Sequence, residues 1–98
     1  MESGENKALH ATVEGRVQGV GFRYFVHDFA QNHTLTGWVR NRGDDRVEVY
    51  AEGSDSDLND LLRALWRGPG SAMVSKVEFD WLPPQNQHSR FSILTSEY

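Results

Sequence analysis

The sequence predicts an α+β fold in which two helices cover one face of an antiparallel sheet. Apolar and polar residues alternate over 9–13 and again over 47–52, which is typical of strands with one buried face. In two other segments apolar residues recur three or four positions apart, the spacing of a helix with one buried stripe. The expected elements are, in order, strand 9–13, helix 22–32, strand 36–41, strand 47–52, a helix that begins after Ser54 or Ser56 and ends before Gly68, strand 76–82 and a short strand 90–95.

This order predicts how the elements assemble. Strand-helix-strand crossovers are right-handed, so the two helices should lie on the same side of the sheet, with the first and third strands in its middle. Burying one face of the sheet under two helices is an economical way to form a single core. The predicted architecture is a ferredoxin-like α/β plait, β-α-β-β-α-β with a short extra strand. Since this fold serves many activities, it does not indicate a function by itself.

The first strand and the first helix are the clearest local signals. Leu9, Ala11 and Val13 alternate with polar residues. The apolar stripe of the first helix consists of Phe22, Phe25, Val26, Phe29 and Ala30. This helix should end near residues 32–33. Both elements therefore have one face to bury.

A hairpin is expected next. Strand 36–41 leads through a tight turn at 42–46 into the third strand, where Val47, Val49 and Ala51 share one face. Glycine at Gly43 and acidic residues nearby are typical of such turns. The hairpin pairs the second strand with the third.

The second helix has clear start and stop signals. Ser54 and Ser56 are good caps, and acidic residues favour the positive end of a helix. Gly68 and Pro69 end it, because the first permits a left-handed turn and the second cannot continue a helix. Its apolar stripe is Leu58, Leu61, Leu62, Leu65 and Trp66. The fourth strand should end at the prolines 83–84.

Length and composition limit the class of protein. A chain of 98 residues fits one domain, which we place at 8–98 after a mobile tail at 1–7. The formal net charge of −4 argues against nucleic acid and anionic membranes as partners. There is no cysteine, so thiol catalysis and cysteine-ligated metals are excluded. No apolar run approaches the roughly 20 residues of a membrane span. We expect a cytoplasmic monomer.

The segment Gly15-Arg16-Val17-Gln18-Gly19-Val20-Gly21-Phe22-Arg23 connects the first strand to the first helix. Its glycines allow successive backbone N–H groups to turn toward one point, at a helix end that attracts anions. Arg23 in the first turn would oppose the helix dipole unless an anion lay between them. Neither the dinucleotide fingerprint nor the Walker pattern is present. The residues alone leave two interpretations: a phosphate site, or a turn whose glycines merely permit its geometry.

A resemblance favours the first interpretation. The segment 15–23 resembles the first signature of the acylphosphatase family. Gly37-Trp38-Val39-Arg40-Asn41, followed by Val47-Glu48-Val49 and Gly53, resembles the second. Both match in order and separation, and the family's α/β plait would cover about residues 9–95.

This resemblance implies hydrolysis of the carboxyl–phosphate bond of small acyl phosphates, with inorganic phosphate as a product. The arginine that matches Arg23 binds the phosphate together with loop amides, and the asparagine that matches Asn41 positions the attacking water. The amides implied are those of Gln18, Gly19, Val20, Gly21 and Phe22. No metal and no organic cofactor are expected. The alternative is a non-catalytic phosphate-binding module on the same fold.

One position departs from the family pattern. The family usually has glycine two residues before the valine that matches Val47, where this chain has Asp45, and its glycine comes earlier, at Gly43. Either Asp45 adopts a left-handed conformation, or the turn shifts to use Gly43. This difference lies close to Asn41.

Overall fold

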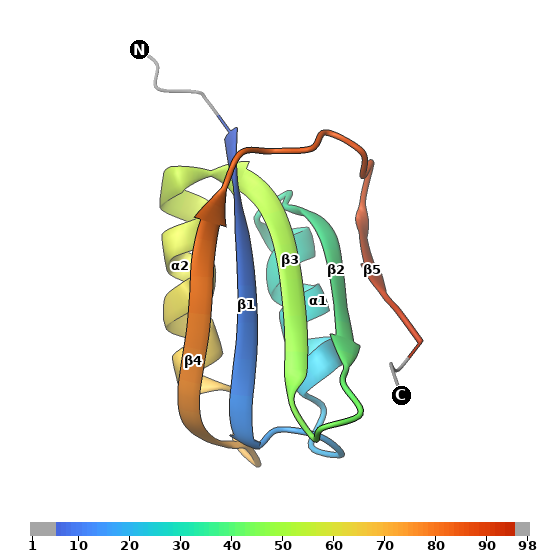
Figure 1. Cartoon of the computed structure of the whole chain (residues 1–98), viewed down its shortest axis with the longest axis vertical. Helices are drawn as coiled ribbons and strands as arrows, with labels where there is room; N and C mark the ends of the chain where they lie inside the picture. Colours follow the sequence, from blue (N-terminus) through green and yellow to red (C-terminus); the bar gives the residue numbers. More distant parts are fainter. Residues whose placement is uncertain (1–5, 96–98) are drawn as a thin grey trace.

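The computed structural model describes residues 6–95 of the chain. The elements are β1 (Asn6–Arg16), α1 (Phe22–Asn32), β2 (Thr36–Asn41), β3 (Val47–Ser54), α2 (Asp55–Arg67), β4 (Met73–Leu82) and β5 (Phe91–Ile93). Figure 1 shows both helices behind one sheet, on the same face. The predicted element order and the predicted side of both helices are confirmed.

The strands form one sheet in the order β4-β1-β3-β2-β5. β1 and β3 are central and antiparallel, as predicted, with Leu9 opposite Ala51 and Val13 opposite Val47. The prediction of a purely antiparallel sheet is wrong in one place, because β5 runs parallel to β2. After β4, the chain crosses the end of the sheet, and β5 then runs alongside β2 in the direction of β2 (Figure 1). The sheet is therefore mixed.

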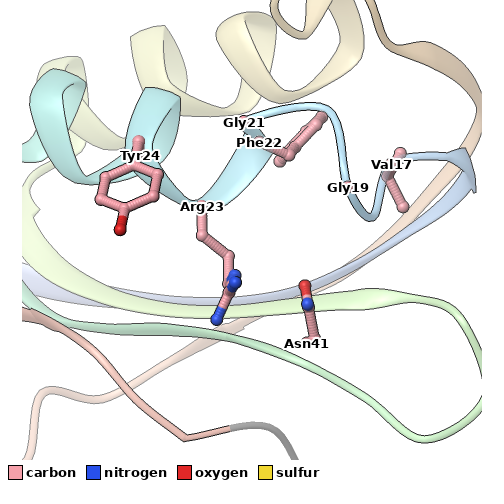
Figure 2. Close-up of a pocket in the computed structure, with 7 residues that line it drawn as sticks. All are labelled: Val17, Gly19, Gly21, Phe22, Arg23, Tyr24 and Asn41. Carbon is pink, nitrogen blue, oxygen red and sulfur yellow. The ribbon is translucent and has the colours of Figure 1, made fainter.

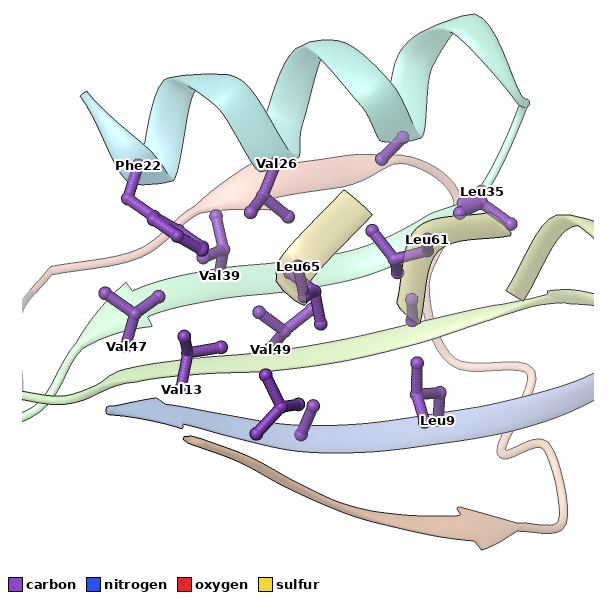
Figure 3. Close-up of a cluster of buried hydrophobic side chains, with 14 of the residues drawn as sticks. Leu9, Val13, Phe22, Val26, Leu35, Val39, Val47, Val49, Leu61 and Leu65 are labelled. Carbon is purple, nitrogen blue, oxygen red and sulfur yellow. The ribbon is translucent and has the colours of Figure 1, made fainter. Parts of the chain in front are cut away.

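The hydrophobic core lies between the sheet and the helices. Figure 3 shows sheet residues such as Val13 and Val49 meeting helix residues such as Val26 and Leu65. The large side chains that are almost completely buried are Phe22, Leu9, Leu58, Leu61, Leu65, Val13, Val17, Val26, Val39, Val47 and Val49. Val17 begins the loop between β1 and α1, and Phe22 directly follows it, so the core anchors both ends of this loop.

Some boundaries and exposures differ from the sequence predictions. β1 begins at Asn6, and residues 6 and 7 pair with Ser54 and Gly53, so this part of the expected tail belongs to the sheet. The rest of that tail lies outside the described residues. Trp66, expected on the buried stripe of α2, is 49% exposed. Leu65 beside it is completely buried, whereas Leu62, one turn earlier on the same side as Trp66, is only partly buried, so Trp66 lies at the edge of the stripe.

The open face of the sheet, the face away from the helices, is less exposed than its polar residues suggest. Glu52 is buried, because the connection between β4 and β5 covers it. Its carboxylate accepts hydrogen bonds from the backbone N–H groups of Gln85 and Asn86 and from the Tyr50 hydroxyl. Burial and the Glu52 carboxylate raise the pKa of Tyr50 to about 12. This face therefore fixes the last connection of the chain.

The backbone of the turn between β2 and β3 distinguishes the two alternatives, a left-handed Asp45 or a turn shifted to Gly43. Asp45 has φ 70°, and it is one of the three described non-glycine residues with positive φ. The Asp45 N–H donates to the Arg42 carbonyl at 3.3 Å, and the Arg42 N–H donates to the Arg46 carbonyl at 2.8 Å. Asp45 thus takes the conformation that glycine adopts without strain, and the turn has not shifted to Gly43.

Substitutions in this turn should follow that backbone conformation. We expect Asp45→Ala to lower the free energy of unfolding by about 1 kcal/mol relative to Asp45→Gly, because alanine tolerates positive φ poorly. Urea denaturation of both variants measures the difference. Gly43→Ala is the matched control and should be close to neutral. A larger loss from Gly43→Ala than from Asp45→Ala would contradict the assignment.

Candidate active site

The glycine loop, residues 17–21, leads from β1 into α1. Gly19 and Gly21 have φ values of 73° and 80°, in the left-handed region. A Cβ atom added at either position would meet no other atom within 4 Å. Glycine is thus needed here for the backbone conformation and not for space. The result is a sharply curved chain that ends at the first turn of α1.

The first turn of α1 is left open to a partner. Gly21 is its N-cap, no side chain caps it, and no acidic residue lies in the turn. By contrast, α2 satisfies its own start: the Asp57 N–H donates to Ser54 Oγ at 3.1 Å, and Asp55 lies in its first turn. The uncapped N–H groups of α1 and its positive end can bind an anion.

These groups line a pocket of about 200 Å³. Its lining residues are Val17, Gly19, Gly21, Phe22, Arg23, Tyr24 and Asn41. Figure 2 shows the Arg23 guanidinium and the Asn41 carboxamide pointing into the space between the loop, the start of α1 and the end of β2. Two residues 18 positions apart, from the two separate sequence motifs, are thereby brought to one pocket.

Most of the predicted site residues lie at the pocket, but two do not line it. Gly19, Gly21, Phe22, Arg23 and Asn41 do. Gln18 and Val20 are not among the lining residues; Val20 packs partly against the core, and the Gln18 side chain turns toward the β2–β3 turn. The Phe22 ring is buried in the core, so only its backbone can serve the pocket.

Sequence reasoning did not identify Tyr24 as part of the site. Its ring is 66% exposed and lies on the far side of Arg23 from the glycine loop (Figure 2). The apolar stripe predicted for the first helix does not include it. Its position directly after Arg23, in the first turn of a helix that begins at the pocket, was the available signal.

The pocket's electrostatics favour an anion. Among the described residues that line it, Arg23 carries the one formal charge, and none has a carboxylate, imidazole or thiol. Uncapped N–H groups add partial positive charge from the same direction. The pocket therefore offers hydrogen-bond donors and lacks a side chain suited to general base catalysis near neutral pH.

An ion-pair network supports β2 immediately before Asn41. Glu48 on β3 accepts a hydrogen bond from Arg40 Nε at 2.9 Å, and its other oxygen lies 2.6 Å from His10 Nε2. Burial alone would raise the pKa of Glu48, but its bonds to His10 and Arg40 outweigh burial and lower it. The network lies on the open face of the sheet, so it holds the strands and does not enter the pocket.

One group of side chains has the composition of a cation site. His33, Asp57 and Asp60 place ligand atoms within 4.8 Å of one another. They lie where the C-terminal end of α1 meets α2, at the opposite end of α1 from Arg23. Arg63 already pairs with Asp60. The group is separate from the pocket, and sequence spacing did not reveal it because 24 residues separate His33 from Asp57.

Comparison with known proteins places this fold and pocket in a family. The model of the acylphosphatase family matches residues 9–93 of the 98-residue chain. The chain belongs to the acylphosphatase family. Its matching region contains every residue that lines the pocket.

Individual acylphosphatases are similar to this chain in sequence and in structure. A protein named acylphosphatase from Salinibacter ruber is 46% identical over 81 residues, which are 83% of this chain and 85% of that protein. One from Pseudomonas paraeruginosa is 53% identical over 79% of this chain and 85% of its own length. The crystal structure of acylphosphatase from Bacillus subtilis superposes with a TM-score of 0.86 at 41% identity, covering 90% of this chain and 98% of that one. The ferredoxin-like fold predicted from the sequence is confirmed. Among the described residues of this family member, no helix is long and apolar enough to cross a membrane.

Proposed function

We propose that this acylphosphatase hydrolyses the carboxyl–phosphate bond of small acyl phosphates in the pocket formed by the glycine loop, Arg23 and Asn41. The observation that carries the proposal is the meeting of these three features in one pocket that is rich in donors. Membership of the family supports the same reaction. The products are a carboxylate and inorganic phosphate.

In the proposed mechanism, the phosphoryl group lies against the loop amides and the first turn of α1. The Arg23 guanidinium donates to two of its oxygens in a fork, a geometry that a lysine ammonium cannot reproduce. Donors that are already oriented stabilise the charge of the phosphoryl oxygens in the transition state. Gly19 and Gly21 contribute backbone N–H groups, and their left-handed conformation curves the loop around the phosphoryl group.

A water molecule is the nucleophile. The Asn41 carboxamide accepts a hydrogen bond from this water and orients its oxygen toward phosphorus. As the new O–P bond forms, the bond between phosphorus and the acyl oxygen breaks, and its electron pair leaves with the carboxylate. This leaving group is stable without a proton, so no general acid is required.

The proton lost by the water goes to a phosphate oxygen of the substrate. Asn41 is neutral and cannot act as a strong base, and within residues 6–95 no carboxylate or imidazole lines the pocket. The reaction therefore balances with the substrate's own phosphate as proton acceptor. A pH dependence near neutrality that disappeared when one protein side chain was replaced would contradict this step.

The direct test is phosphate release from acetyl phosphate and benzoyl phosphate in the presence of a chelator. We expect turnover well above spontaneous hydrolysis, and the same rate with and without the chelator, because the proposed chemistry needs only protein donors and water. Saturable inhibition by inorganic phosphate should accompany it. Turnover that required an added metal would overturn the mechanism.

The same assay separates the enzyme from a non-catalytic binding module. A chain that bound phosphate but never exceeded spontaneous hydrolysis would be such a module. The presence of Asn41 beside the anion site favours the enzyme, since binding alone does not require a group that orients water.

We further infer that the protein acts as a monomer in the cytoplasm, without nucleic acid or membranes as partners. The net charge of −4 supports the absence of nucleic acid and anionic membranes as partners. Light scattering at several concentrations, with and without acyl phosphate, tests the monomer. A mass of two chains under turnover conditions would contradict it.

A further inference from the structure

Gln18 makes two hydrogen bonds that connect the glycine loop to the turn after Asn41. Its side-chain Nε2 lies 2.9 Å from the Arg42 carbonyl and 2.9 Å from the Arg46 carbonyl. We call this pair of bonds the Gln18 bridge. Its acceptors are the two residues that close the β2–β3 turn, since the Arg42 N–H also donates to the Arg46 carbonyl.

The bridge joins two parts of the active site that lie on different strands. The phosphate-binding loop follows β1, whereas Asn41 is the last residue of β2, and β3 lies between these strands. Asn41 itself pairs with Val47 on β3. The position of the Asn41 carboxamide relative to the loop thus depends on how the β2–β3 turn is held.

The chemistry of glutamine suits both acceptors. Its side-chain NH₂ group has two N–H donors, one for each carbonyl. Both hydrogen bonds are partly buried. If the glutamine donors were removed, the two carbonyls would lose a partner that water could replace only in part. Because the Arg42 carbonyl is one residue beyond Asn41, holding it restricts the backbone that carries the Asn41 side chain.

We propose that Gln18 is a positioning residue that holds Asn41, and with it the attacking water, in register with the phosphate-binding loop. This inference rests on the proposed function. Gln18 acts through its side chain and not as a ligand of the phosphate, since it does not line the pocket. It links the first sequence motif physically to the second.

Two variants of similar shape remove the donors. Gln18→Met keeps the length of the side chain and has no donor, and Gln18→Glu replaces the donors by oxygens that repel both carbonyls. We expect kcat to fall about 10- to 100-fold in Gln18→Met and further in Gln18→Glu, because small misplacement of a reacting group is costly. Inhibition by inorganic phosphate should change by less than about threefold in Gln18→Met, since Arg23 and the loop amides remain.

A double-mutant cycle distinguishes positioning from a merely structural role. If Gln18 acts through Asn41, adding Gln18→Met to Asn41→Ala should lower kcat little further. Multiplication of the two losses in the double variant would overturn the proposal, as would a Gln18→Met enzyme with unchanged kcat. Thermal unfolding of each variant shows whether lost activity reflects lost fold.

A second readout does not depend on activity. In nitrogen-15 NMR spectra, Gln18→Met should shift or broaden the Asn41 side-chain amide signals, while backbone amides of the core, such as Leu65, stay in place. Unchanged Asn41 signals would count against the bridge. Absence of turnover in the native chain would refute the proposed function instead, so the two failures are distinguishable.

Discussion

Replacing Arg23 by alanine is expected to remove both turnover and phosphate binding. Arg23 is the charged side chain among the described residues of the pocket, and it lies beside the uncapped start of α1. Loss of a preorganised donor typically lowers kcat about 10²- to 10³-fold, and Arg23 should exceed this because substrate binding is lost with it. The measurement is phosphate release from acetyl phosphate, together with inhibition by inorganic phosphate.

Arg23→Lys tests whether the fork of donors matters beyond the charge. We expect it to recover part of the phosphate affinity and little of kcat, because an ammonium cannot donate to two oxygens in the same fixed geometry. Arg63→Ala on α2 is the matched control, since that arginine is exposed and pairs with Asp60 away from the pocket. It should keep full activity. Native kcat in Arg23→Lys would show that charge alone is sufficient, and wild-type phosphate inhibition in Arg23→Ala would remove Arg23 from the binding site.

Asn41→Ala is expected to separate turnover from binding. Its carboxamide is assigned to the water and not to the phosphate, so kcat should fall by about 10²- to 10³-fold while phosphate inhibition stays near the native value. Titration calorimetry, in which phosphate is added to the variant until it is saturated, gives the binding constant independently of the slow reaction.

Asn41→Asp sharpens the assignment. A carboxylate of the same shape can still accept a hydrogen bond from water, but it repels a phosphoryl group in the same pocket, so phosphate binding should weaken. Asn59→Ala is the control, since Asn59 on α2 donates its side-chain amide to the Asp55 carbonyl, away from the pocket. Equal losses of binding and turnover in Asn41→Ala would mean that Asn41 holds the phosphate.

Much of the fold could be predicted because its signals are local. The apolar stripe of α1 records which side of the helix is buried. The alternation in β3 marks the residues that join the core, Val47, Val49 and Ala51, although the residues between them are buried as well. Ser54 and Gly68 mark the ends of α2 by their own backbone and side-chain chemistry, and both act there as predicted. The handedness of the crossovers then left few arrangements for the sheet. The first sequence motif similarly indicated the glycine loop, whose left-handed residues need glycine wherever the loop lies.

Local sequence patterns do not indicate which distant residue each side chain contacts. The direction of β5 depends on the path of the chain over the end of the sheet, and periodicity has no direction. Glu52 is buried by a connection more than 30 residues later, so its polarity suggested an exposed position. Gln18 belongs to the first motif, yet its side chain serves the turn after Asn41. Its role follows from a contact across 24 residues, which forms only when tertiary packing brings the glycine loop beside that turn.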